Sequence, residues 1–389
     1  MAESGAPCAR RAWAALTATP SIRNAVVQVC DPKGETLFEA VHGLARPDAP
    51  MTVSHRFHLA SVAKTMTATL LLQLAEEGAF GAKGIDAAYA GFGVFSPDIM
   101  ARLHRRDGVS LAHTITLRHL LTHTSGIRDA MEDDANTLGG PAPGSLIGAI
   151  RSGKSEAARF WRPWSPERPE DASAGVINLF LATGIADAAL SDPGTRFHYS
   201  DTGFMLLALL AEKITGQSYG VLLHERIFAP LGLADTYLAY RCDPLDLGPK
   251  RTPESEFWSD DLPLLESGVS LSFDWGGGGV VSSALSLNRF LRALLAGELF
   301  KSRGTLAAML SWATPPNLEP PRTGVGLGVF RTAMNGVELI GHSGASGAKM
   351  FHAPRGGFFI SGTINQSSGP GDWHWPIARC WVEPTGGRS

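Results

Sequence analysis

The residues best suited to chemistry form the segment Ser61-Val62-Ala63-Lys64, at the start of a predicted helix. A serine at a helix start and a lysine three residues later lie on the same face of that helix. Amide groups at the helix N-terminus and the nearby ammonium favour the serine alkoxide, and the amine can take its proton. The spacing therefore predicts that Ser61 is a nucleophile. A second copy, Ser346-Gly347-Ala348-Lys349, lies in a glycine-rich turn that enters a strand, so it lacks this helical geometry.

Two later segments add polar groups that a nucleophilic serine needs. Tyr199-Ser200-Asp201 precedes a predicted helix. Tyr199 is a candidate second proton carrier, because a phenol near a lysine ammonium shifts toward phenolate. The alternative role for Tyr199 is structural, with a packed ring and a hydrogen-bonded hydroxyl. His342-Ser343-Gly344 closes a predicted strand, where a glycine lets a substrate approach the backbone closely.

A pair of histidines lies in the segment His119-Leu-Leu-Thr-His123-Thr-Ser-Gly126, which ends one predicted helix and begins a loop. Two histidines four residues apart on one helix face can bind a metal ion. The sequence shows neither the glutamate of H-E-x-x-H nor an evident third ligand, so hydrogen bonding at the helix end is the favoured interpretation. We therefore expect neither a metal nor a cofactor.

Together these segments resemble the class C β-lactamase-like serine hydrolases, a family that includes D-alanyl-D-alanine carboxypeptidases, D-aminopeptidases and family VIII carboxylesterases. The resemblance extends over roughly residues 20–368. The motifs that carry it, in chain order, are Ser61-Val-Ala-Lys64, Leu120-Leu-Thr-His-Thr-Ser-Gly126, Tyr199-Ser-Asp201, Pro230-Leu-Gly-Leu233, Gly276–Ser283 and His342-Ser-Gly344. Each motif alone is modest, and their common order makes the resemblance specific.

This resemblance implies a mechanism and a fold. Ser61 would attack a carbonyl group and hold the acyl group, while Lys64 and Tyr199 would share the proton transfers. The backbone N–H groups of Ser61 and Ala345 would form the oxyanion hole, and two such donors contribute several kcal/mol to catalysis. The fold implied is an α/β sandwich with an all-helical domain, similar to β-lactamases and penicillin-binding protein transpeptidases.

Two positions depart from the family pattern and bear on the substrate. Class C β-lactamases and many penicillin-binding proteins carry Lys-Thr-Gly where this chain has His342-Ser343-Gly344, a segment that we still expect to bind substrate. Histidine is mostly neutral at pH 7, which disfavours efficient β-lactam hydrolysis. Asp201 stands where asparagine is frequent. Its carboxylate would pair with Lys64, receive a substrate amine, or serve a structural role away from the cleft.

The expected function is hydrolysis of an ester or small amide through an acyl-enzyme on Ser61. Three alternatives stay open: transfer of the acyl group to an alcohol or amine, β-lactam hydrolysis, and a binding module without catalysis. An α/β-hydrolase is disfavoured, because the nucleophile elbow of that fold leads into a helix. Here Gly341-His-Ser343-Gly-Ala345 is followed by predicted strands.

The elements that must position these residues change character along the chain. A hairpin is predicted over 24–31 and 35–43, and helices are predicted over 10–18, 61–78, 204–215, 219–228, 287–296 and 372–382. An antiparallel meander is predicted from strands at 324–332, 337–342, 348–353 and 358–364.

This order predicts an α/β (α+β) fold with two parts. Residues 1–80 and 272–389 would form an antiparallel sheet domain flanked by helices, and residues 81–271 a mainly helical insertion domain. The active site would lie in the cleft between them. Residues 152–171, rich in tryptophan and proline, predict an irregular surface excursion.

The composition is that of a compact globular protein. The chain has 389 residues and a net charge of −3, which disfavours a nucleic-acid partner. No apolar run reaches the ~18 residues that span a bilayer, and no secretory signal is visible. Its four scattered cysteines, at positions 8, 30, 242 and 380, favour buried thiols. We expect a cytoplasmic protein that binds a small-molecule ester or amide; the sequence is silent on oligomeric state.

Overall fold

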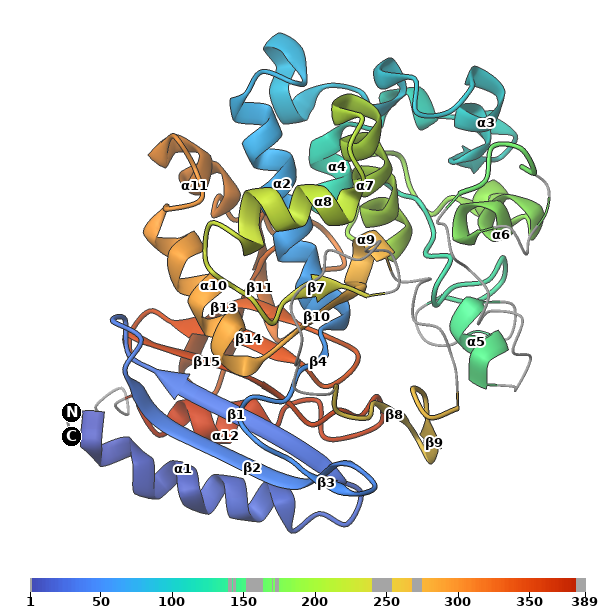
Figure 1. The fold of residues 1–389 in the computed structure, drawn as a ribbon. Coiled ribbons are helices and arrows are strands. Elements are labelled where there is room, and N and C mark those ends of the chain that lie inside the picture. Colours follow the sequence, from blue (N-terminus) through green and yellow to red (C-terminus); the bar gives the residue numbers. More distant parts are fainter. Residues whose placement is uncertain are drawn as a thin grey trace.

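The computed structural model describes residues 2–138, 142, 145–151, 164–169, 171, 175–239, 254–267 and 275–382. Its main feature is an eight-stranded antiparallel sheet with the strand order β11-β12-β13-β14-β15-β1-β2-β3 (Figure 1). The strands are β1 (Asn24–Cys30), β2 (Thr36–Arg46), β3 (Ala49–Pro50), β11 (Arg322–Val325), β12 (Phe330–Met334), β13 (Val337–Ser343), β14 (Lys349–Ala353) and β15 (Phe358–Thr363).

The sheet joins the two ends of the chain. β1 pairs antiparallel with β15, with Val26 opposite Thr363, and it pairs with β2 on its other side. The turn between β1 and β2 is fixed by Asp31, whose carboxylate accepts the backbone N–H groups of Lys33 and Glu35, both at 2.8 Å. The predicted hairpin and the predicted meander are therefore confirmed, and they belong to one sheet.

Both faces of the sheet are covered by helices, which explains why every residue of β1 is buried. Val27 and Val29 pack in one hydrophobic cluster with α1 (Ala2–Thr17) and α12 (His374–Arg379). Val26, one residue along, packs in the larger cluster on the opposite face, together with α10 (Ala284–Ala296). Because side chains alternate along the strand, β1 contributes residues to the hydrophobic clusters on both faces of the sheet.

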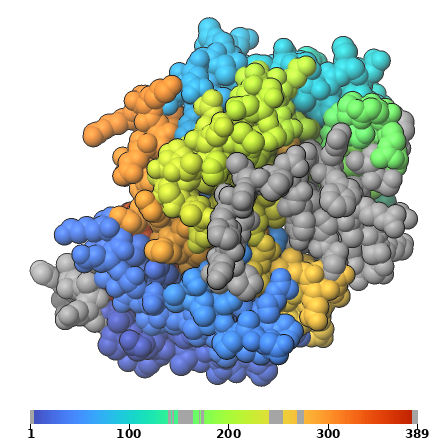
Figure 2. Space-filling view, in the orientation of Figure 1, coloured from blue at the N-terminus to red at the C-terminus, as the bar shows by residue number. Residues whose placement is uncertain are grey.

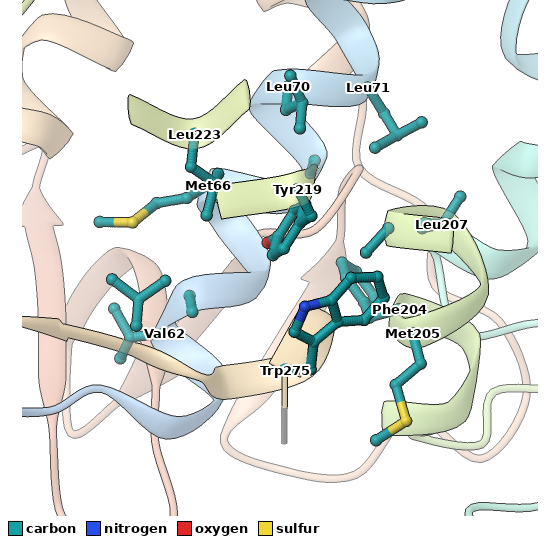
Figure 3. Packing of buried hydrophobic residues seen from close by; sticks show 14 of the residues in the cluster. Val62, Met66, Leu70, Leu71, Phe204, Met205, Leu207, Tyr219, Leu223 and Trp275 are labelled. Atoms are coloured by element: carbon teal, nitrogen blue, oxygen red, sulfur yellow. The ribbon is translucent and has the colours of Figure 1, made fainter. Parts of the chain in front are cut away.

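A helical layer lies above the sheet and is organised around α2 (Ala63–Glu76), which is buried over most of its length. Figure 3 shows Tyr219 of α8 (Tyr219–Leu223) between Leu70 of α2 and Trp275 of α9 (Trp275–Gly278), with Phe204 of α7 (Asp201–Thr215) nearby. Met66 of α2 points to the other side, near Leu223. A helix buried on all sides must be apolar all round. This explains the run of Leu, Met, Ala and Thr in α2.

The remaining elements are short. The helices are α3 (Pro97–Arg102), α4 (Leu117–Leu121), α5 (Leu146–Arg151), α6 (Val176–Ala182), α11 (Arg303–Met309), the 3-10 turns η1 (Ala60–Val62), η2 (Gly81–Asp86), η3 (Tyr89–Phe92), η4 (Ala112–Thr114) and η6 (Ile185–Ala188), and the π-helical turn η7 (His224–Phe228). The strands are β4 (Phe57–His58), β10 (Val280–Ser282) and β7 (Tyr237–Leu238) in one small sheet, and the hairpins β5 (Arg105–Arg106) with β6 (Val109–Ser110) and β8 (Trp258–Ser259) with β9 (Leu262–Pro263).

The first strands and the middle of the chain lie at different ends of the molecule. In Figure 2 the blue N-terminal segment forms one end of the molecule, and the cyan and yellow-green segments form the other. The small sheet β4-β10-β7 takes strands from both expected domains. The division into 1–80 with 272–389 and 81–271 stays a prediction, and most of the expected excursion at 152–171 falls outside the described residues.

Several predicted elements differ in detail. The helix predicted over 10–18, for example, is α1 and begins at Ala2. The predicted helix over 61–78 begins later, because residues 60–62 form a 3-10 turn and Ser61 is not its cap. Helix α10 is capped by Ser283, whose hydroxyl accepts the Ser286 N–H, so Ser286 lies inside the helix. The predicted strand over 324–332 is two strands, because Gly328 adopts a φ of +69° and reverses the chain between β11 and β12.

The expectation of buried thiols is wrong for two of the cysteines. Cys8 of α1 and Cys380, directly after α12, form a disulfide with a Cα–Cα distance of 5.6 Å. The partners are 372 residues apart in sequence, so local spacing gave no indication of the bond. Cys30 is a buried free thiol as expected, and Cys242 lies outside the described residues. None of the helices in the described ranges has the length and apolarity needed to cross a membrane.

Candidate active site

The candidate nucleophile lies in a strained turn. Ser61 is half-buried in η1, directly before α2. The preceding residue, Ala60, has a φ of +46°, a left-handed conformation that residues other than glycine rarely adopt. Such strain persists only where the surroundings enforce it, and it clusters at functional sites. One enforcing contact is the hydrogen bond of 2.7 Å that the Ser346 hydroxyl donates to the His58 carbonyl, just before the turn.

Lys64 is fully buried and links three segments of the chain. Its Nζ donates hydrogen bonds to Ser61 Oγ at 3.0 Å, to the Gly277 carbonyl of α9 at 2.7 Å, and to the Asp201 carboxylate of α7. Three acceptors match the three N–H groups of a protonated amine. Lys64 therefore sits in the site as an ammonium group that polarises the serine hydroxyl.

Asp201 is the first residue of α7 and is 7% exposed. The helix is capped by Ser200, whose hydroxyl accepts the Gly203 N–H at 3.3 Å. A carboxylate in the first turn of a helix is stabilised by the helix dipole. Of the roles considered for Asp201, the structure shows the pairing with Lys64, and the reception of a substrate amine stays a prediction.

Tyr199 lies beside the ammonium group. Lys64 Nζ is 4.9 Å from the centroid of the Tyr199 ring, a favourable cation–π distance. The phenol oxygen is buried, and it lies close enough to Ser61 and Lys64 for hydrogen bonding with them to lower its pKa slightly. Burial raises the pKa of the phenol, and the nearby Lys64 charge only partly opposes this shift. Tyr199 is therefore a protonated phenol whose hydroxyl is available for a reacting group.

His123 holds the Tyr199 segment in place, a role that the sequence reasoning missed. Its ring stacks on the Tyr199 ring with centroids 4.2 Å apart. Its Nδ1 accepts the Ser200 N–H at 3.1 Å, and its carbonyl accepts the His198 N–H at 2.8 Å. These contacts are possible because His123 adopts a φ of +55°, beyond the end of α4. In the sequence, the only feature that pointed to His123 was its spacing of four residues from His119, which we considered as a candidate metal site.

His342 of β13 faces the same group of rings. Its centroid is 6.3 Å from that of Tyr199 and 4.9 Å from that of Phe330. Its Nδ1–H donates to the Ser343 carbonyl at 2.8 Å, while within the described chain its buried Nε2 has no partner. Burial and the Lys64 charge lower the pKa of His342 to about 3. His342 is thus neutral at pH 7, as expected from its side-chain type.

The turn after β13 presses against the nucleophile turn. A Cβ atom on Gly344 would lie 2.2 Å from the Leu59 carbonyl oxygen, so only glycine allows this approach. The approach brings the turn that carries the exposed residue Ala345 next to η1. An oxyanion hole formed by the Ser61 and Ala345 amides stays a prediction. Ser343 pairs with Lys349 in the sheet register, and alternation along β13 directs its side chain to the face opposite His342.

A buried carboxyl group not considered from the sequence lies behind Asp201. Asp129 is 2% exposed; it accepts the Met131 N–H at 3.0 Å and donates its own N–H to the Asp133 carboxylate at 2.9 Å. Burial, and the charge of Asp201, raise the pKa of Asp129 well above its usual range. A neutral Asp129 therefore stands beside the ionised pair of Lys64 and Asp201.

Two other candidate motifs have structural roles. Lys349 of the second Ser-x-x-Lys copy lies in β14, as predicted, and not on a helix. His119 forms a reciprocal cap with Thr116 at the start of α4, which confirms hydrogen bonding at a helix end. His123 lies outside that helix, so the two histidines do not share a helix face. Across the described ranges, His, Cys, Asp and Glu form no group of three that could hold a metal ion.

The approach of Gly344 to Leu59 gives a first prediction. Gly344→Ala should push the Ala345 turn away from Ser61, lower the free energy of unfolding by about 1–3 kcal/mol, and reduce kcat more than it changes KM. Ester hydrolysis and urea unfolding measure these effects. Gly371→Ala is the matched control, because a Cβ there meets nothing within 4 Å. Equal behaviour of the two variants would contradict the role of Gly344.

The buried pair of Lys64 and Asp201 gives a second prediction. Lys64→Met should lower the free energy of unfolding by about 3–5 kcal/mol, because it leaves Asp201 buried without its partner. Adding Asp201→Asn should restore most of this stability while activity stays absent. Urea unfolding of the two single variants and the double variant measures the coupling. If the double variant is no more stable than Lys64→Met, the unpaired Asp201 carboxylate is not the cause of the lost stability.

The raised pKa of Asp129 gives a third prediction. A carboxyl whose pKa is higher in the folded state stabilises the fold at low pH, and this stability is lost as pH rises from about 4 through the raised pKa. Asp129→Asn should therefore match the wild type near pH 4 and be more stable at pH 8. Thermal unfolding across this range tests it, and a variant that is less stable at every pH would contradict the shift.

Comparisons with known proteins agree with this geometry. The Beta-lactamase family matches residues 9–374 of the chain. Penicillin-binding protein 4* of Bacillus subtilis (strain 168) is 24% identical over 326 residues, which are 80% of this chain and 60% of that protein. Esterase EstB of Burkholderia gladioli is 29% identical over 205 residues, 52% of this chain and 44% of that protein. The chain thus spans less than two thirds of these curated relatives.

Solved structures confirm the fold. A D-stereospecific amidohydrolase from Streptomyces sp. superposes with a TM-score of 0.72 and 26% identity, covering 98% of this chain and 99% of that chain. The expected α/β fold of β-lactamases and penicillin-binding proteins is therefore correct. Because the family match covers nearly the whole chain, the protein belongs to the Beta-lactamase family.

Proposed function

We propose that the protein is a serine hydrolase that cleaves small esters or amides through an acyl-enzyme on Ser61. One observation carries this proposal: the Lys64 ammonium, fully buried, donates a hydrogen bond of 3.0 Å to Ser61 Oγ. A buried cation beside a hydroxyl favours its alkoxide and so activates the nucleophile. Ser61 itself is half-buried, which leaves it open to a substrate.

The neighbouring groups suit the later steps. The Ser61 and Ala345 amides would stabilise the oxyanion that forms when Ser61 attacks the carbonyl. The protonated phenol of Tyr199 would deliver a proton to the leaving alcohol or amine and recover it from Lys64. Water would then attack the acyl-enzyme with the same groups acting in reverse. Tyr199 suits this task because its hydroxyl is protonated and lies beside Ser61 and Lys64.

The charges of the site disfavour substrates that need a cation to bind their carboxylate. His342, buried and neutral, does not supply the fixed cation that binds a carboxylate at this strand. We therefore rank esters and amides above β-lactams. The similarity to an amidohydrolase described as D-stereospecific makes D-amino-acid amides a substrate class to test beside esters. The cytoplasmic location stays a prediction, and the disulfide between Cys8 and Cys380 is a reason to test it.

The test is intact-mass analysis after incubation with p-nitrophenyl butyrate and, separately, benzylpenicillin. We expect a butyryl adduct and fast ester turnover, a slowly formed penicilloyl adduct, and neither adduct with Ser61→Ala. Adducts that persist in Ser61→Ala would disprove Ser61 as the nucleophile. Rapid penicillin turnover would place β-lactam hydrolysis above ester hydrolysis.

The same assay separates hydrolysis from acyl transfer. The proposal expects butyrate as the product, with a release rate unchanged by added alcohols or amines. Faster release together with a butyryl ester or amide product would identify an acyltransferase. Absence of any adduct and of any turnover with ester, penicillin and D-amino-acid amide would leave a binding module as the better description.

A further inference from the structure

The proton that leaves Ser61 needs an acceptor, and the two groups nearest to it are already protonated. All three N–H groups of Lys64 are matched to acceptors. Lys64 is therefore protonated and cannot accept a further proton. The Tyr199 phenol is buried, which disfavours its phenolate form. Neither group is in the basic form in the resting site. The acceptor must therefore be a group that is in contact with one of them.

Asp201 meets that requirement. Its carboxylate contacts Lys64 Nζ directly, in a buried pair. The titratable groups around it are Lys64 of α2, Asp129 of the loop after α4, Tyr199 two residues earlier and His342 of β13. Asp129 is neutral, Tyr199 is a phenol and His342 is a neutral imidazole. The Asp201 carboxylate and the neutral His342 imidazole can both accept a proton. The carboxylate is hydrogen-bonded to Lys64 Nζ, whereas burial lowers the pKa of His342 to about 3 and makes the imidazole a weak base.

We propose that the Asp201 carboxylate is the final proton acceptor when Ser61 attacks, with Lys64 as the relay. This inference rests on the acyl-enzyme mechanism proposed above. As the bond from Ser61 Oγ to the acyl carbon forms, the Ser61 proton passes to Lys64 Nζ and a different Lys64 proton passes to Asp201. Lys64 thus stays an ammonium group, Asp201 becomes a carboxylic acid, and the negative charge moves to the carbonyl oxygen.

Collapse of the intermediate reverses the relay. The bond from the acyl carbon to the leaving oxygen or nitrogen breaks as Tyr199 donates its proton to the leaving group. Lys64 then returns a proton to Tyr199, and Asp201 returns its proton to Lys64. The site ends with the charges that it had at the start, apart from the acyl group on Ser61. This role for position 201 requires a carboxylate, because an asparagine there cannot take up a proton.

The test is the pH dependence of kcat/KM for p-nitrophenyl butyrate in Asp201→Asn. General-base catalysis contributes about 10²–10⁴-fold, so we expect a loss of this size at pH 7. We also expect the remaining activity to rise with pH, because Lys64 must then lose a proton to solvent before it can act. The wild type should instead reach a plateau near neutral pH. Asp201→Glu should restore that plateau, even where its rate stays low.

Asp129→Asn is the matched control, since it removes a neighbouring buried carboxyl that is neutral and takes no part in the proposed relay. Its pH profile should follow the wild type. Asp201→Asn with near wild-type activity and an unchanged profile would overturn the relay, and so would a loss of activity that is equal at all pH values. Formation of the Ser61 adduct by the wild type, measured separately by mass, shows whether the proposed acyl-enzyme itself holds.

Discussion

One buried charge sets the arrangement of this site. The Lys64 ammonium must be satisfied on all sides, because an unpaired cation in the core costs several kcal/mol. Its acceptors come from three places: the 3-10 turn before α2, the first residue of α7, and a carbonyl of α9. These segments lie far apart in sequence. Folding the charge into the core therefore also brings together the groups that surround Ser61.

The close packing around Lys64 requires small residues at specific points. A Cβ on Gly276 would lie 2.7 Å from the Phe204 carbonyl, so α9 can meet α7 only because it is built from glycines. Thr67, one turn along α2, donates to the Gly276 carbonyl at 2.8 Å and fixes the same contact. On the other side, Gly344 allows the β13–β14 turn to reach Leu59. The glycine-rich segments thus allow α9 and the β13–β14 turn to pack closely around Ser61 and Lys64.

The sequence predicts much of this structure where the signal is local. Periodicity and turn residues gave the hairpin, the meander and most of the helices, and the Ser61–Lys64 spacing gave the pair that is hydrogen-bonded. What it missed depends on tertiary contacts. The roles of His123 and Asp129 follow from burial against Tyr199 and Asp201. The bond between Cys8 and Cys380 follows from the packing of α1 beside the chain end (Figure 1).

The two departures from the family pattern have a combined electrostatic effect. In the family pattern, with lysine at position 342 and asparagine at position 201, positions 64, 201 and 342 would carry two cations, one of them Lys64. Here Lys64 faces the Asp201 carboxylate, and His342 is neutral, so the same three positions carry no net charge. A site with two buried cations attracts an anionic substrate. In the ion pair of Lys64 and Asp201, by contrast, the charges cancel and the Asp201 carboxylate can accept a proton. The change at 342 thus removes an anion-binding charge, and the change at 201 adds a group in the basic form. Both changes agree with the proposal that the protein acts on esters and amides through Ser61, Lys64 and Asp201.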